Sequence, residues 1–343
     1  MTVALTGGSD RAIIHMSEYL IMAAVRPSPV LFHGPVPAFP GIAAGKLASD
    51  LDLSHDELRA LLALAAEVKA RPAEYQGALA GRYVSLLFEK PSLRTRMTFE
   101  LAVKQLGGDV VTSTGPIAAR EPVKDVARNL ERWTQGIVAR TFSQDTINDL
   151  ARWSSAPVVN ALSDRFHPCQ ALADAQTLVE RFGDLKGLTL AFVGDGNNVA
   201  NSLLLTLTRL GMNVNVATPQ GYEPDAAVVE QAKAFADAAG AAVKITNDPH
   251  EAAEGAQAIY TDVWASMGQE EEAAIRQTHF AAYQVNDKLM SGAAPEAIFL
   301  HCLPAKRGQE VTDGVIESAQ SAVFDQAENR LHAQKALLLM LLA

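Results

Sequence analysis

Short apolar runs alternate with longer amphipathic segments along most of the chain. The runs fit buried strands, whereas the longer segments repeat their apolar residues at helical spacing. The first helix is expected after Ser54 and Glu57, which fit a capping box. Strands are expected at residues 83–88, 136–139, 157–160, 188–193, 214–217, 258–263 and 297–300, and further helices at 94–106 and 199–210.

This alternation predicts βαβ units, which form parallel sheets with helices on both faces. The chain has 343 residues, which is more than a single core usually supports. We therefore expect an α/β protein with two doubly wound parallel-sheet domains. Ligands of such sheets bind beyond the carboxyl ends of the strands, so we expect the active site in the cleft between the two domains.

The domain boundaries follow from the same pattern. Residues 1–45 show no sustained period and end in a stretch rich in Pro and Gly, so we expect a loosely ordered extension. We predict one domain at 46–182, a second at 183–326, and a C-terminal helix at 327–343 that packs back on the first domain. The apolar run within that helix is far shorter than the roughly 20 residues of a membrane span, so no membrane is expected as a partner.

Composition narrows the choice of partners. The chain carries 39 acidic and 29 basic side chains, a formal net charge of -10, which argues against nucleic acid as the main partner. A local cluster of arginines must therefore bind any anionic ligand. The only cysteines are Cys169 and Cys302, which indicates a reducing, cytoplasmic location without a disulfide framework.

A candidate anion site lies at residues 88–96, where a buried strand ends, the chain turns at Pro91 and a helix begins. Ser92 is the expected N-cap. Free amides at the helix start, the hydroxyls of Ser92 and Thr95, and the guanidinium groups of Arg94 and Arg96 would together bind a phosphate. The same residues also fit an ordinary capped helix with surface arginines, so other segments must decide.

Two further segments supply the decision. Residues 166–174 read Phe-His-Pro-Cys-Gln-Ala-Leu-Ala-Asp and residues 299–304 read Phe-Leu-His-Cys-Leu-Pro. Together with Ser-Leu-Arg-Thr-Arg at 92–96 they resemble the three signature motifs of the carbamoyltransferase family. A lone His or Cys usually reflects packing, and neighbours such as His301 and Cys302 face opposite ways on a strand, so the combination is the specific signal.

Residues 262–268, Asp-Val-Trp-Ala-Ser-Met-Gly, resemble the loop with which the ornithine branch of that family binds ornithine and closes over it. The similarity extends from about Lys46 to Ala343 and leaves the N-terminal extension outside. It implies transfer of a carbamoyl group from carbamoyl phosphate to the side-chain amine of L-ornithine, with citrulline and phosphate as products. Residues 46–182 would bind carbamoyl phosphate and residues 183–326 ornithine.

The resemblance also implies how the reaction runs. The neutral side-chain amine would attack the carbamoyl carbon directly, so neither a metal nor an organic cofactor is implied. We expect arginine biosynthesis as the metabolic role. The resemblance further implies a homotrimer, or an assembly of trimers, with each active site shared between subunits.

Specific residues are carried over from the family motifs. Arg140 and His167 would lie near the carbonyl oxygen, where charge develops in the transition state, while Asp262 and Cys302 would orient the amine; these four are the expected catalytic residues. The expected carbamoyl phosphate site comprises Ser92, Leu93, Arg94, Thr95, Arg140, His167, Gln170, Cys302, Leu303 and Arg330. The expected ornithine site comprises Asn198, Asp262, Ser266 and Met267.

Taken singly, three of these residues also fit a purely structural role. Arg140 could be a buried ion-pair partner, Asp262 a strand-end cap and Cys302 an inert buried thiol. Two positions depart from the family pattern. Leu93 stands where many members have Thr, and Pro116 stands where many have a Gln that reaches a neighbouring subunit's phosphate site. We therefore expect weaker phosphate binding, although Arg120 could substitute for that Gln.

Three other functions are open. Gly194-Asp195-Gly196 follows a strand and opens a helix as in dinucleotide-binding oxidoreductases, but the third glycine is replaced by Val199. A relative acting on N-acetyl- or N-succinyl-ornithine is a second alternative, against which the loop around Ser266 argues because it grips a free α-amino group. A carbamoyltransferase-like protein that binds the substrates or a partner without turnover is the third.

Overall fold

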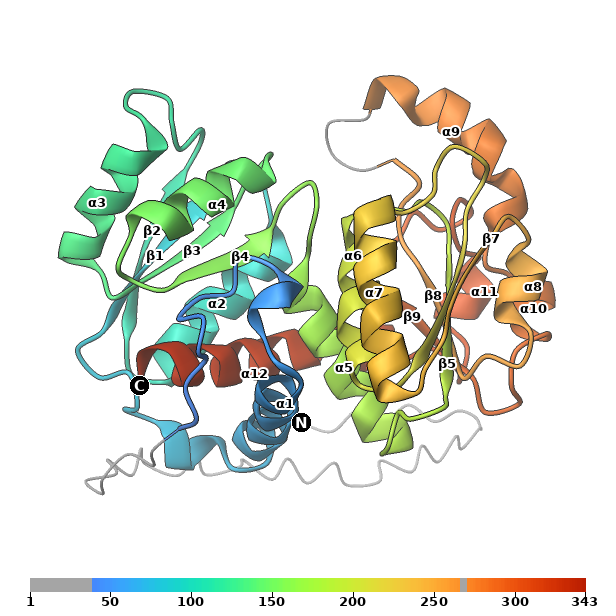
Figure 1. Ribbon diagram of the computed structural model, residues 1–343, viewed down its shortest axis with the longest axis horizontal. Helices are drawn as coiled ribbons and strands as arrows, with labels where there is room; N and C mark the ends of the chain where they lie inside the picture. The colour runs from blue at the N-terminus through green and yellow to red at the C-terminus, as the bar shows by residue number, and fades with distance from the viewer. Residues whose placement is uncertain (1–38, 266–269) are drawn as a thin grey trace, which may run out of the picture. The chain divides into compact units, whose positions relative to one another are not determined.

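The computed structural model describes residues 39–265 and 270–343, and Figure 1 shows their arrangement. They contain two sheets in which all paired strands are parallel, as the sequence predicts. The first sheet has the order β2-β1-β3-β4 and the second β7-β6-β5-β8-β9. The strands are β1 (Tyr83–Phe88), β2 (Asp109–Thr114), β3 (Gly136–Arg140), β4 (Val158–Leu162), β5 (Thr189–Val193), β6 (Asn213–Ala217), β7 (Val243–Thr246), β8 (Ala258–Thr261) and β9 (Ile298–His301).

Helices connect the strands. They are α1 (His55–Ala70), α2 (Leu93–Gln105), α3 (Val123–Trp133), α4 (Gln144–Trp153), α5 (Pro168–Phe182), α6 (Asn198–Arg209), α7 (Ala226–Ala239), α8 (Pro249–Ala253), α9 (Ala273–Phe280), α10 (Asp287–Met290), α11 (Asp313–Ile316) and α12 (Val323–Leu342), with short 3-10 turns at Asp50–Asp52, Pro72–Tyr75, Glu270–Glu272 and Ala281–Tyr283. The expected capping box at the start of α1 is confirmed, because Ser54 and Glu57 satisfy each other's backbone amides.

Helices cover both faces of the first sheet because successive strand residues point to opposite sides. In β1, Val84, Leu86 and Phe88 face the core that contains α1, α2, α5 and α12. Leu87 faces the other way, into a separate apolar cluster with residues of α3 and α4. Figure 1 shows α3 and α4 on one side of this sheet and α2 and α12 on the other. The carboxyl ends of β1 and β3 therefore lie at the edge of the sheet where the helices that follow them, α2 and α4, begin.

The second sheet is covered in the same way. Leu190 and Phe192 of β5 pack toward α6 and α7 in the large core. Ala191 and Val193 of the same strand pack on the opposite face, in a cluster that includes residues of α8, α10 and α11. Both faces of β5 are buried, as is typical of central strands in a doubly wound sheet.

The apolar pattern of the sequence did not predict two of the strands, β2 and β7. Both lie at a sheet edge, where one side of the strand has no neighbour. Most side chains of β2 are exposed, so polar residues such as Asp109 and Thr112 are tolerated there and no apolar run forms. The predicted strand at 258–263 is too long, since β8 ends at Thr261 and Asp262 follows it.

The C-terminal helix α12 begins at Val323, earlier than the predicted start at residue 327. It packs against α1, α2 and α5, and nearly every residue from Asn329 onward is buried. Within residues 39–265 and 270–343, no helix is both long and apolar enough to cross a bilayer. Most of the predicted N-terminal extension, residues 1–38, lies outside the described residues, as do Ser266 and Met267.

Candidate functional site

The start of α2 carries the first group of predicted site residues. Ser92 is the N-cap, as expected, and its hydroxyl accepts a hydrogen bond from the amide of Thr95 at 3.3 Å. Thr95 is buried at the first turn, while Leu93 is 70% exposed and points away from the core. The helix start thus offers its amides and the Thr95 hydroxyl to one location, and the Leu93 side chain adds no polar group there.

Two buried arginines meet at Thr95. Arg140 ends β3 and Arg330 lies on α12, which are far apart in sequence. Arg330 Nη2 donates to Thr95 Oγ1 at 3.1 Å, and Arg140 Nη1 approaches the same oxygen at 3.5 Å. Burial and the Arg330 charge lower the pKa of Arg140 to about 10, and Arg94 acts in the same direction. Both guanidinium groups nevertheless stay charged at neutral pH, which concentrates positive charge at the start of α2.

This cluster has unused hydrogen-bonding capacity. Arg140 Nε, Arg330 Nε and His167 Nδ1 are buried and have no hydrogen-bond partner. A buried polar atom without a partner is unfavourable by about 1–3 kcal/mol, and unpaired buried charges are unfavourable by more. Such an arrangement is expected where a bound anion completes the set.

His167 precedes α5, whose first residue is Pro168. Its backbone amide donates to Ser202 Oγ at 2.9 Å, and Ser202 in turn donates to the buried carboxylate of Asp50 at 2.6 Å. Burial, together with the charges of Arg330 and Arg140, holds the pKa of His167 well below 6.5. The imidazole is therefore neutral at physiological pH and acts as a hydrogen-bond donor or acceptor without carrying charge.

Gln170 lies one turn into α5 and faces Arg330. Its Oε1 accepts from Arg330 Nη1 at 2.6 Å, and its Nε2 donates to Asp174 Oδ1 at 2.7 Å. The predicted carbamoyl phosphate-site residues Thr95, Arg140, Gln170 and Arg330 are thus brought into contact by four separate elements, α2, β3, α5 and α12. Their roles toward a ligand stay predictions.

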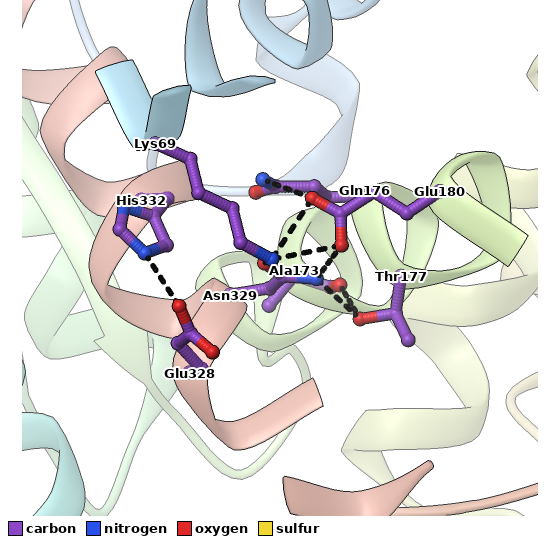
Figure 2. A network of polar contacts seen from close by, with 8 residues as sticks. All are labelled: Lys69, Ala173, Gln176, Thr177, Glu180, Glu328, Asn329 and His332. Atoms are coloured by element: carbon purple, nitrogen blue, oxygen red, sulfur yellow. Dashed lines mark hydrogen bonds and ion pairs between the residues drawn. The ribbon is translucent and has the colours of Figure 1, made fainter. Parts of the chain in front are cut away.

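A polar network anchors the part of α12 that carries Arg330 (Figure 2). Lys69 of α1 donates to Asn329 Oδ1 at 2.8 Å and to Glu180 of α5 at 2.9 Å. Asn329 donates to Thr177 Oγ1 at 3.0 Å and to Glu180 Oε2 at 2.9 Å. Because Asn329 directly precedes Arg330, these ties between three helices restrain the guanidinium's position as well.

The second group of predicted residues lies at the carboxyl ends of β8 and β9. Cys302 Sγ donates to Asp262 Oδ1 at 3.0 Å, and Asn197 Nδ2 donates to Asp262 Oδ2 at 2.8 Å. Burial and the Asp262 carboxylate raise the pKa of Cys302 well above 9. The thiol is therefore protonated, which makes it a hydrogen-bond donor and a poor nucleophile.

The loop after β9 is held by a buried pair, His301 and Glu310. The amide of Leu303 donates to His301 Nδ1 at 2.8 Å, so the ring proton resides on Nε2, which donates to Glu310 Oε1 at 3.2 Å. Leu303 has φ 56° and a cis peptide bond to Pro304. His301 and Cys302 point in different directions, as expected for neighbours at a strand end, and each binds a different carboxylate.

Asp262, His301 and Cys302 could in principle hold a metal ion, since one potential ligand atom from each lies within 4.8 Å of the others. Both ring nitrogens of His301 already have partners, and the thiol is protonated. Each of the three side chains therefore has hydrogen-bond partners within the protein.

Asn198, the remaining predicted ornithine residue among those described, begins α6. Its side-chain amide donates to the carbonyl oxygen of Ser163 at 2.6 Å.

Asp195, two residues before the N-cap Asn197, forms a buried ion pair with Arg276 at 2.8 Å. Gly196 has no space for a side chain, because a Cβ there would lie 2.3 Å from the backbone nitrogen of Pro224. Packing on this neighbouring loop explains the glycine without a dinucleotide.

The two groups of residues influence one another. The charges of Arg330, Arg94 and Asp262 all affect the pKa of Arg140. The cationic group at α2 and the acidic group at β8 therefore lie near a common location at the guanidinium of Arg140. Sequence reasoning missed Asn197 and Asp174, which contact the predicted residues Asp262 and Gln170, and Glu310, which contacts His301. The only sequence signal for Asn197 and Asp174 is that both lie inside the motifs around residues 195–198 and 166–174.

Comparisons with known proteins divide the chain into two successive segments. The family model described as "Aspartate/ornithine carbamoyltransferase, carbamoyl-P binding domain" matches residues 46–180, and the model described as "Aspartate/ornithine carbamoyltransferase, Asp/Orn binding domain" matches residues 186–341. The ornithine carbamoyltransferase of Thermus thermophilus is 54% identical over 290 residues, which cover 83% of this chain and 93% of that protein.

Solved structures give the same picture. The ornithine carbamoyltransferase from Pyrococcus furiosus superimposes with a TM-score of 0.86 at 44% identity, covering 88% of this chain and 98% of that one. N-acetyl-L-ornithine transcarbamylase superimposes with a TM-score of 0.78 but at 31% identity, covering 89% of this chain and 99% of that one. The chain is thus similar in fold to both and more similar in sequence to the former.

Proposed function

Because the chain belongs to the aspartate/ornithine carbamoyltransferase family, we propose that it is an ornithine carbamoyltransferase, which moves the carbamoyl group of carbamoyl phosphate to the side-chain amine of L-ornithine. The amine nitrogen forms a bond to the carbonyl carbon, and the bond from that carbon to the phosphate oxygen breaks. The products are citrulline and phosphate, and no step requires a covalent enzyme intermediate.

The observation that carries the proposal is the pair of buried arginines at Thr95, whose Nε atoms have no partner. A dianionic phosphate would neutralise both charges and fill this unused hydrogen-bonding capacity. In the proposal, Ser92, Arg94, Thr95 and Arg330 bind the phosphate of carbamoyl phosphate. Leu93 contributes through its backbone amide, since its exposed side chain offers no donor.

The carbonyl oxygen gains negative charge as the amine attacks. We assign Arg140 and the neutral His167 to that oxygen, because fixed donors aimed at developing charge stabilise the transition state more than the substrate. A neutral imidazole contributes one hydrogen bond without adding a third cation to the cluster. Gln170 and the loop with Cys302 and Leu303 are assigned to the carbamoyl amine.

The ornithine amine must lose a proton before it attacks, since an alkylammonium has a pKa of about 10.4. We assign Asp262 and Cys302 to this amine. Both oxygens of Asp262 already accept hydrogen bonds, from Cys302 and Asn197, so the carboxylate has a fixed orientation. The departing phosphate takes up the proton that the attacking nitrogen releases, which balances the reaction. Asn198, Ser266 and Met267 are assigned to the amino-acid end of ornithine.

The domain roles, direction and location complete the proposal. Residues 46–182 bind carbamoyl phosphate, 183–326 bind ornithine, and 327–343 pack back on the first domain. We assign the forward direction, toward arginine biosynthesis, and the cytoplasm, where the free thiols of Cys169 and Cys302 would stay reduced. A catalytic efficiency that is higher for citrulline phosphorolysis than for citrulline formation would overturn the assigned direction.

We also propose a homotrimer. On α2, Leu93, Met97 and Leu101 recur every four residues and are 70%, 51% and 41% exposed. Contiguous apolar exposure of this kind is typical of a protein interface, and its position next to the Arg94 site supports an active site completed by a second subunit.

One assay tests the proposed reaction: citrulline formation from carbamoyl phosphate with L-ornithine, compared with N-acetylornithine, N-succinylornithine, putrescine and aspartate as acceptors. We expect turnover with ornithine and at least a hundredfold lower catalytic efficiency with each alternative acceptor, about 3 kcal/mol of transition-state discrimination. Preference for an acylated ornithine would overturn the assignment, as would substrate binding without turnover.

A further inference from the structure

Asp174 is a buried carboxylate directly behind the predicted ligand-binding residues. It lies one turn after Gln170 on α5 and is fully inaccessible to solvent. Gln170 Nε2 donates to Asp174 Oδ1 at 2.7 Å, and Gln326 Nε2 donates to the same oxygen at 2.6 Å. The reaction as proposed above assigns no role to this carboxylate.

The hydrogen bonds define the orientation of both glutamine amides. Gln326 Oε1 accepts from the backbone amide of His301 at 2.9 Å. A backbone N–H can only donate, so the opposite end of the Gln326 amide must be its NH2 group, which faces Asp174. At the other side of Asp174, Arg330 can only donate, and it donates to Gln170 Oε1 at 2.6 Å. The His301 amide and the Arg330 guanidinium therefore fix which end of each glutamine side chain faces Asp174.

One consequence concerns the face that Gln170 presents to a ligand. A glutamine amide turned by 180° would present NH2 in place of oxygen, with little change in shape. Asp174 and Arg330 together prevent this turn, because Asp174 Oδ1 accepts from Gln170 Nε2 while Arg330 donates to Gln170 Oε1, so Oε1 remains an acceptor. An acceptor there binds a ligand N–H and gives no hydrogen bond to a methyl group.

We propose that Asp174 is a positioning residue that makes the site selective for an acyl phosphate bearing an NH2 group over one bearing a methyl group, by holding Gln170 Oε1 toward the ligand. The inference rests on the proposed function, in which Gln170 binds the carbamoyl amine. The substrate class that it selects is a carbamoyl phosphate rather than an acetyl phosphate.

The second oxygen of Asp174, Oδ2, allows a conservative substitution by asparagine as a test. Oδ2 is buried, and neither glutamine donates to it. In Asp174→Asn the amide oxygen can occupy the Oδ1 position and keep accepting from both glutamines, with the NH2 group at the Oδ2 position. In Asp174→Leu, a side chain of similar size has no acceptor, so Gln170 Nε2 loses its partner and only Arg330 still holds the amide.

The experiment uses two inhibitors that compete with carbamoyl phosphate and differ only at the selected group. Phosphonoacetamide carries NH2 beside its carbonyl, and acetonylphosphonate carries CH3 at that position. Inhibition constants are measured from citrulline formation by the unmodified enzyme, Asp174→Asn and Asp174→Leu. Thr208→Val is the control, since Thr208 is also buried but lies on α6 and only donates to the carbonyl of Leu204.

We expect the unmodified enzyme to prefer phosphonoacetamide by about tenfold, the effect of one hydrogen bond in a buried site. Asp174→Asn and Thr208→Val should keep this ratio. Asp174→Leu should lower it clearly, although the loop with Cys302 and Leu303 still faces the NH2 group, and should raise the KM for carbamoyl phosphate about tenfold. If the leucine variant does not fold, Asp174→Ala removes the same acceptor and is expected to give the same loss of preference.

Two outcomes would overturn the inference while leaving the proposed function intact. One is an unchanged inhibitor ratio in a folded Asp174→Leu or Asp174→Ala variant. The other is an equal loss of preference in Asp174→Asn, which would show that the charge rather than the accepted hydrogen bond matters. Absence of citrulline formation by the unmodified enzyme would instead overturn the proposed function and the inference together.

Discussion

Cys302 Sγ donates a hydrogen bond to Asp262 Oδ1 across 3.0 Å, although the two residues are 40 positions apart. They follow adjacent strands, β9 and β8, whose carboxyl ends meet at the same edge of the sheet. Asn197 holds the other oxygen of the carboxylate. Because burial and Asp262 raise the pKa of the thiol well above 9, Cys302 is an uncharged donor that orients its neighbours.

Replacing Cys302 distinguishes orientation from nucleophilic catalysis. Cys302→Ala should lower kcat/KM for ornithine by about ten- to a hundredfold, since a hydrogen bond to a charged group contributes about 1.5–3 kcal/mol. Cys302→Ser, which still donates to Asp262, should retain most of the activity. Steady-state kinetics test this, and a carbamoylated cysteine detected by mass spectrometry during turnover would contradict it.

The pH profile reports on His167. Burial and two arginines hold its pKa well below 6.5, so the imidazole is neutral at pH 7. We therefore expect kcat/KM for carbamoyl phosphate to show no inflection near pH 6.5. His167→Gln keeps an uncharged donor and should be more active than His167→Ala, which should lose about a hundredfold in kcat. Equal loss in both variants would argue against a hydrogen-bonding role.

The exposed Leu93 gives a gain-of-function test. Leu93→Thr adds a hydroxyl at the first residue of α2, beside the Ser92 cap, and should lower the KM for carbamoyl phosphate several-fold through one additional hydrogen bond to phosphate. Val179→Thr, at an exposed position of α5, is the control and should leave this KM unchanged. An unchanged or higher KM in Leu93→Thr would count against the assigned phosphate position.

Asp50 makes the stability of the protein depend on pH. Burial raises its pKa from 3.8 to about 6, while bonds from Ser202 and Thr206 and the charge of Arg209 oppose that shift. Because the folded-state pKa lies above the unfolded one, the stabilising contribution is complete below pH 4 and is lost as the pH rises through 6. Asp50→Asn cannot ionise and should raise the free energy of unfolding at pH 8 by about 1–2 kcal/mol relative to the unmodified protein.

Thermal melts at pH 4.5 and pH 8 measure this difference. The stabilisation by Asp50→Asn should be much smaller at pH 4.5 than at pH 8. Asp149→Asn, at an exposed position of α4, is the control and should change neither value. A gain from Asp50→Asn that is the same at both pH values would exclude ionisation of Asp50 as its cause.

The apolar face of α2 predicts the assembly. Met97→Glu places a charge in the middle of the exposed apolar row and should dissociate the proposed trimer, as measured by sedimentation. Ile275→Glu is the control, since Ile275 is similarly exposed, at 57%, but lies on α9. A trimer that persists in Met97→Glu would show that another surface forms the interface.

The central strands and the first helix were predictable from sequence because their information is local. β1 was predicted over its observed range, Tyr83–Phe88, since a run of apolar residues bounded by turns marks a strand buried on both faces. Ser92 was predictable as an N-cap for the same reason. The edge strands β2 and β7 were not predictable, because solvent on one side permits polar residues and removes the apolar run.

The candidate site was likewise predictable from the sequence only in part. Its residue types could be predicted from short motifs, including Arg94, His167 and Cys302. Their partners could not, because Arg330 bonds to Gln170 across 160 positions and to Thr95 across 235. Asp174 contacts Gln170, and Glu310 contacts His301. Neither carboxylate was predictable, because no sequence pattern distinguishes a buried carboxylate from a surface one.

The sequence by itself determined the layered α/β architecture and the chemical groups available at the strand ends, since periodicity and capping depend only on neighbouring residues. The tertiary structure alone decided which of those groups meet, which nitrogens stay unpartnered, and that the His167 imidazole is neutral and the Cys302 thiol protonated. The physical reason is that burial and the approach of charges from other elements set protonation and orientation, and both arise only when distant segments pack together.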